Sequence, residues 1–193
     1  MTPPISDKQI CSHRHSFALD NFFRRLIHSP KKIIGPYLKS GDTAIDLGCG
    51  PGFFTIPMTE LVGPSGTVIA VDLQEEMLAR VRSKLANMKD QSMAAKLIFH
   101  KCDVEEIKLD EKVQADFILA YYMVHETPDR YHFLQQLRML LKPSGSILIV
   151  EPLFHVSRKD FAETLSIAEQ TGLVIIDRPK GKGGKSALLA THP

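Results

Sequence analysis

A glycine-rich segment between a predicted strand and a predicted helix is the first place where this sequence could hold a ligand. Residues 46–52 (DLGCGPG) follow the apolar run 43–47. Glycines at the end of a strand let the backbone approach a ligand closely, because no side chain intervenes. A carboxylate, Asp72, ends the next predicted strand, where it could accept hydrogen bonds from ribose hydroxyls. Together these features predict a nucleoside-containing cofactor at the carboxyl ends of the strands.

The spacing of the glycines narrows the kind of cofactor. Dinucleotide-binding loops carry the pattern GxGxxG. Here Gly48 and Gly50 occupy the first two positions, but Phe53 stands at the third, so the pattern is GxGxG. This spacing weighs against a nicotinamide dinucleotide. The alternative is a tight strand-to-helix turn that is purely structural and binds no ligand. That alternative would leave Asp72 without a role.

The segment after the fourth predicted strand offers a candidate general base. Residues 121–126 (YYMVHE) include His125, whose ordinary pKa lies near neutrality. Glu151, which ends the fifth predicted strand, should face the same rim. The alternative for His125 is that it orients the loop or caps the helix that begins near Pro128.

Two further groups of residues could do chemistry elsewhere in the chain. Cys11, His13 and His15 alternate near the N-terminus, but this spacing is not a standard zinc pattern, so we predict no metal site. A polar helix entrance, or a cap over the acceptor pocket, is the alternative. The basic turn 178–185 could touch an anionic substrate or RNA, or it could be a solvated hairpin tip.

The elements that must position these residues alternate along the chain. Apolar runs predict strands at 43–47, 67–71, 96–100, 115–120, 146–150, 173–177 and 185–190. Helical periodicity predicts helices at 53–61, 75–88 and 128–141, and from 157 to Gly172. Ser157, with Asp160 three residues later, forms an imperfect capping box at the start of the last one. This order predicts an α/β fold, a Rossmann-like, doubly wound sheet of seven mostly parallel strands. The turn before the last strand is too short for a parallel crossover, so that strand should be antiparallel.

The N-terminal region and the composition indicate the domain organisation, the classes of partner and the cellular location. Residues 17–27 and 30–37 read as helices, so we predict a helical cap over 1–40 and one ligand-binding domain over 41–193. The net charge of +2 gives no reason to expect nucleic-acid binding, and we find no apolar run that could cross a bilayer. Three widely spaced cysteines favour reduced thiols and a cytoplasmic location. The sequence leaves the oligomeric state open.

Several segments resemble the motifs of class I S-adenosylmethionine-dependent methyltransferases, in the same order and spacing. They are AIDLGCGPGFFT (44–55), VIAVDLQEEML (68–78), KCDVEEI (101–107), ADFILAYYMVHE (115–126) and LKPSGSILIVEP (141–152). The final hairpin is also similar to that fold. Within this family, the chain more loosely resembles the small-molecule enzymes of the ubiquinone/menaquinone C-methyltransferase and arsenite methyltransferase kind.

The resemblance implies S-adenosylmethionine as the cofactor and assigns contacts to its methionine part. Asp46 and the backbone of Gly48 and Gly50 would hold this moiety. The carbonyl of Ala120 or Tyr121 would meet its ammonium group.

The same resemblance assigns the adenosine part to the ends of the second and third predicted strands. Asp72 would take the ribose hydroxyls and Leu73 would pack against adenine. Asp103 would accept from the adenine amino group, and the Val104 N–H would meet the ring. From spacing alone, Asp103 could equally be a loop carboxylate that caps a turn.

The resemblance also implies the activity, methyl transfer to a small-molecule acceptor that the sequence does not identify. A fold that binds the cofactor without turnover is one alternative. A nicotinamide-dependent oxidoreductase is another, disfavoured by Phe53 and the terminal hairpin. Residues 120–123 (AYYM) also lack the Asn/Asp-Pro-Pro-aromatic motif of many amino-group methyltransferases, which weighs against nucleobase and amide nitrogen acceptors.

Overall fold

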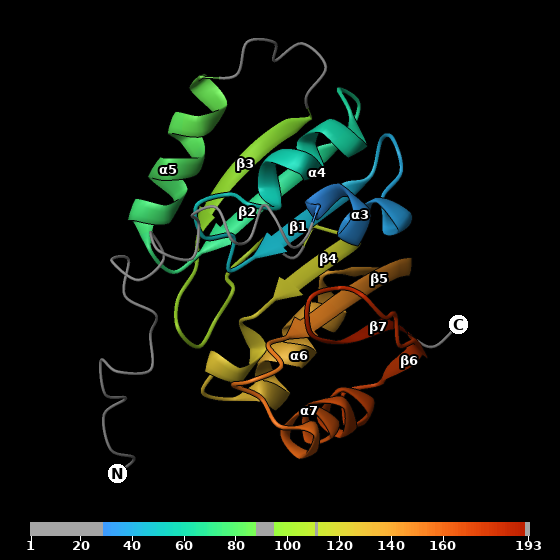
Figure 1. Cartoon of the computed structure of the whole chain (residues 1–193). Coiled ribbons are helices and arrows are strands. Elements are labelled where there is room, and N and C mark those ends of the chain that lie inside the picture. Colours follow the sequence, from blue (N-terminus) through green and yellow to red (C-terminus); the bar gives the residue numbers. More distant parts are fainter. Residues whose placement is uncertain (1–28, 88–94, 111, 192–193) are drawn as a thin grey trace.

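Seven strands form one sheet that runs through the middle of the molecule (Figure 1). The computed structural model describes residues 29–87, 95–110 and 112–191. Across the sheet the strands follow the order β3-β2-β1-β4-β5-β7-β6. Their bounds are β1 Thr43–Leu47, β2 Thr67–Asp72, β3 Lys96–Lys101, β4 Ala115–Tyr121, β5 Leu141–Glu151, β6 Leu173–Asp177 and β7 Lys185–Thr191.

The strand directions confirm the predicted mixed sheet. Every neighbouring pair from β3 to β5 is parallel, whereas β7 is antiparallel to both β5 and β6. The loop 178–184 closes the β6–β7 hairpin, and β7 lies between β5 and β6. The direction of propagation reverses between β1 and β4, which is where open α/β sheets bind their ligands.

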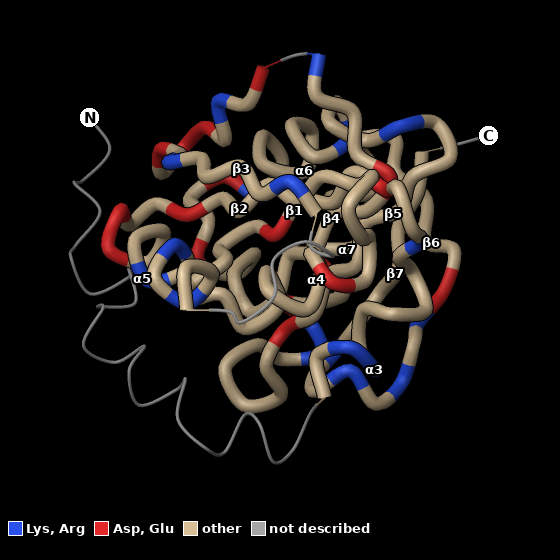
Figure 2. The backbone as a smooth tube through the Cα atoms, turned by 90° about the horizontal axis from the view of Figure 1, so that it is seen from above, with Lys and Arg blue, Asp and Glu red and all other residues tan. Residues whose placement is uncertain are grey.

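Helices cover both faces of the sheet (Figure 1). One face carries α3 (Pro30–Ile34), the 3-10 helix η1 (Gly35–Tyr37), α4 (Thr55–Val62) and α5 (Glu75–Ala86). The other face carries α6 (Arg130–Met139) and α7 (Arg158–Gln170). The short 3-10 helix η2 (Val124–Glu126) lies between β4 and α6. Basic residues gather around α3, whereas charges of both signs alternate along most of the chain (Figure 2).

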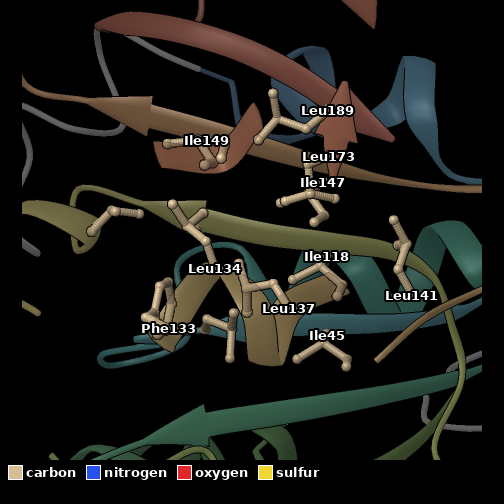
Figure 3. Close-up of a cluster of buried hydrophobic side chains, with 14 of the residues drawn as sticks. Ile45, Ile118, Phe133, Leu134, Leu137, Leu141, Ile147, Ile149, Leu173 and Leu189 are labelled. Carbon is tan, nitrogen blue, oxygen red and sulfur yellow. The ribbon is translucent and has the colours of Figure 1, made fainter. Parts of the chain in front are cut away.

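Strand residues alternate between the two helical layers, so both faces of the sheet are buried. On the α6 face, Ile45, Ile118 and Ile147 pack with Leu134 and Leu137 (Figure 3). On the opposite face, a second cluster gathers residues of α3, α4 and the sheet, among them Ile34, Met58, Ala44, Phe117 and Leu148. A parallel sheet needs this two-sided cover, which explains the nearly continuous apolar runs in the sequence.

Several predicted boundaries move by a few residues. The predicted helix 53–61 begins at Thr55, because residues 51–54 form turns. The predicted helix 128–141 spans Arg130–Met139, since the Asp129 side chain caps it by accepting from the His132 N–H. The fifth strand begins at Leu141 and not at 146, because Leu141 pairs with Ala115 across a bulge. The imperfect capping box predicted at Ser157 and Asp160 is present.

The division of the chain at residue 40 stays a prediction. Of the predicted cap, residues 29–40 are described, and α3 buries Ile33 and Ile34 against the sheet. The predicted helix 17–27 lies outside the described residues, as do Cys11, His13 and His15. Among the described residues, no helix has both the length and the apolar character required to span a bilayer.

Candidate active site

The glycine loop between β1 and α4 leaves little room for a side chain at Gly48 and at Gly52. Gly48 has a φ of +63°, and a Cβ built on it would lie 3.2 Å from the Cβ of Met123. Gly52 has a φ of +85°, and its Cβ would lie 3.0 Å from a methyl of Val81 on α5. Positive φ values and these close approaches both favour glycine. The loop therefore passes tightly between α5 and the segment after β4.

Asp72, at the carboxyl end of β2, braces this loop. One carboxylate oxygen accepts from the Gly50 N–H at 2.8 Å, and the other accepts from the Gln74 N–H at 2.9 Å. The residue is 7% exposed, and burial raises the pKa of its carboxyl group. Each carboxylate oxygen can accept a second hydrogen bond. Asp72 therefore holds the loop and keeps the acceptor capacity that ribose hydroxyls require.

Asp46 lies beneath the loop on the side of α4. The residue is 2% exposed, and the Thr55 hydroxyl donates to its carboxylate at 2.6 Å. Burial raises the pKa of Asp46 to about 7, although the Thr55 hydrogen bond acts in the opposite direction. The carboxyl group that the sequence assigned to the methionine moiety is thus a buried acid that titrates near neutrality.

This buried acid makes the stability of the protein depend on pH. The pKa rises from 3.8 to about 7 on folding, so the folded state holds an extra proton between these values. Stability should therefore fall as pH rises through this window. Asp46→Asn keeps an acceptor for Thr55 but cannot titrate. In this variant we expect the contribution of residue 46 to the pH dependence of the free energy of unfolding to disappear. Urea unfolding of both proteins from pH 4 to 8 measures the difference, and a difference that is flat with pH would contradict the assignment.

Two of the predicted adenine contacts, Asp103 and Val104, lie on the loop after β3. The side chain of Asp103 is 61% exposed and accepts from the Lys108 ammonium at 2.8 Å. That hydrogen bond lowers the pKa of the Asp103 carboxyl group. The Val104 N–H, which was assigned to the adenine ring, donates to Asp103 at 3.1 Å. The contact between Lys108 and Asp103 was not predicted from the sequence. Lys108 has a φ of +55°, a backbone conformation that no sequence pattern indicated. Leu73 is half-buried directly after β2.

His125 and Glu151 form a hydrogen-bonded pair at the carboxyl ends of β4 and β5. The His125 backbone N–H donates to one oxygen of Glu151 at 3.0 Å, and ring atom Nδ1 lies 2.5 Å from the other. Glu151 is 1% exposed, whereas the His125 side chain is 28% exposed. The hydrogen bond to Glu151 raises the pKa of His125, although partial burial opposes this shift. The sequence placed both residues on this rim but did not reveal their pairing.

The pairing fixes what the imidazole ring can do. A carboxylate accepts only, so the neutral ring keeps its proton on Nδ1 and leaves a lone pair on Nε2. Nε2 lies 4.0 Å from an oxygen of Glu126, whose pKa is raised by burial. A cavity of about 210 Å³ opens beside the ring, lined by His125, Arg130, His155, Val156, Asp160 and Thr164. This arrangement suits a base that removes a proton from a molecule in the cavity.

The basic hairpin turn between β6 and β7 contacts the two tyrosines at the end of β4. The hydroxyl of Tyr121 donates to the Lys182 carbonyl at 3.0 Å, and that of Tyr122 donates to the Gly183 carbonyl at 2.5 Å. Lys182 itself is 8% exposed, and its ammonium donates to the Ile33 carbonyl of α3 at 2.9 Å. At Lys182 the turn is therefore not a solvated tip, because its side chain binds α3 and its backbone carbonyl accepts from Tyr121 at the end of β4.

These residues fit the nucleoside cofactor that the sequence predicts. Gly48 is exposed and carries no side chain, so the loop backbone is open to a ligand. Asp72 retains acceptor capacity for hydroxyls, and Asp46 provides a carboxyl group close by, with a pKa to which Asp72 contributes. Such a donor and acceptor set matches a ligand that joins a ribose to a charged amino acid.

Comparisons with known proteins agree with this reading. Residues 38–178 match a family described as a methyltransferase domain. A demethylmenaquinone methyltransferase of Lactobacillus johnsonii is 30% identical over 114 residues, which are 59% of this chain and 45% of that protein. One from Staphylococcus aureus (strain JH9) is 29% identical over 114 residues, 59% of this chain and 44% of that protein. The chain thus spans less than half the length of these curated relatives.

A solved structure shows the same fold over nearly the whole chain. It is a SAM-dependent methyltransferase from Aquifex aeolicus, which superposes with a TM-score of 0.79 at 24% identity. The superposition covers 94% of this chain and 98% of that one.

Proposed function

This chain belongs to the methyltransferase-domain family, and from that premise we propose that it transfers a methyl group from S-adenosylmethionine to a small-molecule acceptor. One observation carries the proposal, namely that the braced glycine loop and the His125–Glu151 pair lie together at one edge of the sheet. Met123, two residues before His125, packs against Gly48 of the loop. A donor on the loop and a base beside the cavity would therefore be neighbours.

The bound cofactor supplies an already activated methyl group on its sulfonium sulfur. The protein then has two tasks, to align the acceptor with that methyl group and to exclude water. Asp46, Gly48, Gly50 and Tyr121 are proposed to hold the methionine part. Asp72, Leu73, Asp103 and Val104 are proposed to hold adenosine. For Asp103, binding the adenine amino group would require exchange of the exposed ion pair with Lys108.

His125 is proposed as the general base for an acceptor that must lose a proton. Its Nε2 would accept the proton while Nδ1–H stays bonded to Glu151, which stabilises the imidazolium that forms. Glu151 is a positioning residue, because it acts through the ring and its own carboxylate is buried. The names of the curated relatives, demethylmenaquinone methyltransferases, support a small-molecule acceptor. The free thiols of Cys49 and Cys102 accord with a cytoplasmic location.

Glu151→Gln should shift the titration of His125. The hydrogen bond to the charged partner raises the pKa of the imidazole, so its removal should lower that pKa. Only the neutral ring accepts a proton, so the acid limb of kcat/KM should move to lower pH. The maximal rate should fall as well, because Gln has an NH2 donor in place of one of the two oxygens that bind the His125 backbone N–H and Nδ1. An NMR titration of the ring measures the pKa without an acceptor, and an unchanged value would remove Glu151 from this role.

Methyl transfer itself can be tested with a radiolabelled donor. Incubation with S-adenosylmethionine that carries a tritiated methyl group and a small-molecule cell extract should yield a labelled product. The reaction with His125→Asn should yield far less. If no label is transferred while the donor still binds, the chain is a silent binding module. If label enters only RNA or protein, the small-molecule acceptor is wrong.

A further inference from the structure

The loop that follows β5 exposes large apolar side chains beside the candidate active site. Phe154 is 98% exposed and Leu153 is 57% exposed, whereas Val156 is buried. We name residues 152–159 (PLFHVSRK), which join β5 to α7 in Figure 1, the β5–α7 tip. Single exposed apolar residues are ordinary in proteins, but two adjacent ones at the rim of a cavity call for an explanation.

The β5–α7 tip is held in place at both ends. The ammonium of Lys185 on β7 donates to the carbonyl of Leu153 at 3.0 Å and to that of Val156 at 2.7 Å. On the other side, Ser157 and Asp160 form the capping box that starts α7. The backbone carbonyls on each side of Phe154 and His155 are thus fixed by a single side chain. Leu153 and Phe154 are therefore presented to the surroundings from an anchored loop.

The charges within the β5–α7 tip have one sign, whereas the exposed Asp160 follows it on α7. The β5–α7 tip contains no acidic residue, and His155, Arg158 and Lys159 are exposed. The two acids that flank it are engaged, since Glu151 binds His125 and the Asp160 carboxylate accepts from the Ser157 N–H. Exposed apolar side chains next to basic ones complement the interface of an anionic bilayer, which is apolar inside and negatively charged at its surface. There Phe and Leu enter the acyl boundary while Arg and Lys meet the headgroups.

We propose that the β5–α7 tip docks the protein reversibly on the surface of an anionic lipid bilayer. Two apolar and two basic side chains give a weak association, comparable to that of a single lipid anchor. His155 and Val156 of the tip also line the cavity beside His125, so the docked protein would turn this cavity toward the lipid. The docking is independent of the proposed methyl transfer, but it would give the site access to an acceptor dissolved in the membrane.

The absence of tryptophan from the sequence allows a direct test. Phe154→Trp places a single tryptophan, which can be excited selectively over the tyrosines, at the tip of the full-length protein. With vesicles of phosphatidylglycerol and phosphatidylcholine, we expect a blue shift of its emission and quenching by brominated acyl chains. Met139→Trp is the matched control, because Met139 is 63% exposed at the far end of α6, next to the start of β5. Its emission should not respond to vesicles.

The charge requirement is tested in the same background. Arg158→Glu with Lys159→Glu should lower the vesicle partition of Phe154→Trp by more than about ten-fold. These two substitutions place acidic residues in the first turn of α7, where they favour the helix, so folding should be retained. Raised salt should weaken binding of the parent in the same direction.

Three results would overturn the proposal. One is an emission that anionic vesicles leave unchanged at low salt. Another is equal binding to pure phosphatidylcholine, or binding that survives the charge reversal, since either would mean non-specific apolar adhesion. The third is a blue emission before lipid is added, because the tip would then be covered by another part of the chain or by a second copy. None of these results bears on whether the donor binds or the methyl group is transferred.

Discussion

His125→Ala should lower turnover by about two to four orders of magnitude while leaving donor affinity nearly unchanged. The expected loss follows from removing Nε2, the ring nitrogen that keeps a lone pair while Nδ1 binds Glu151. The glycine loop is formed by other residues, so the donor should bind as before. Single-turnover kinetics with a labelled donor measure the rate of transfer, and calorimetry measures the affinity.

Two further variants distinguish the loss of a base from a loss of stability: one at position 125 and one at another histidine. Alanine leaves the buried Glu151 carboxylate without its ring partner, which costs stability on its own. His125→Asn keeps an amide N–H that can donate to Glu151 but has no basic nitrogen, so it should lose as much activity with less destabilisation. His132→Ala, an exposed histidine on α6, should be silent. A His125→Asn protein with full turnover would show that His125 serves only to orient its loop.

Asp72→Ala should weaken donor binding by about 1–3 kcal/mol through the loss of charge-assisted hydrogen bonds. The carboxylate has two roles, as the proposed ribose acceptor and as the brace for the N–H groups of Gly50 and Gln74. Its removal should therefore also make the loop more mobile, with faster hydrogen exchange at these two amides. Calorimetry with S-adenosylhomocysteine and amide exchange measure the two effects separately.

A carboxylate at the opposite edge of the sheet provides the control for Asp72→Ala. Asp116 also accepts from a backbone N–H, that of Thr43, and pairs with Lys142 at 2.7 Å. Asp116→Ala should destabilise the fold, yet leave the affinity for S-adenosylhomocysteine as it was. If both variants lose affinity equally, the loss reports general destabilisation and Asp72 has no direct contact with the donor.

The order of elements was predictable because each is built from a local pattern. Buried parallel strands show as apolar runs, and the Gly-rich loop marks the strand-to-helix turn after β1. The reversed last strand followed from the length of one turn, and Ser157 with Asp160 indicated the start of α7. Errors fell at boundaries that tertiary contacts decide. Leu141 extends β5 because it pairs with Ala115, 26 positions earlier in the chain.

The sequence predicted which residues lie at the candidate site, but it did not predict the hydrogen bonds between them. Strand ends placed Asp46, Asp72, His125 and Glu151 on one edge, because parallel strands share their carboxyl edge. The bond between His125 and Glu151 was beyond the sequence, since it depends on the turn of η2. The same holds for Lys182, whose charge suggested a solvated tip although the side chain reaches carbonyls of α3. Whether the assigned residues bind the donor stays a prediction.

Donor binding by the wild-type chain tests the central claim most directly. In an isothermal titration, S-adenosylmethionine and S-adenosylhomocysteine should each bind at one site per chain, and NADH should produce no binding heat. This outcome is expected because the GxGxG loop and Asp72 suit a nucleoside joined to an amino acid. Binding of NADH without binding of either sulfur compound would contradict the account.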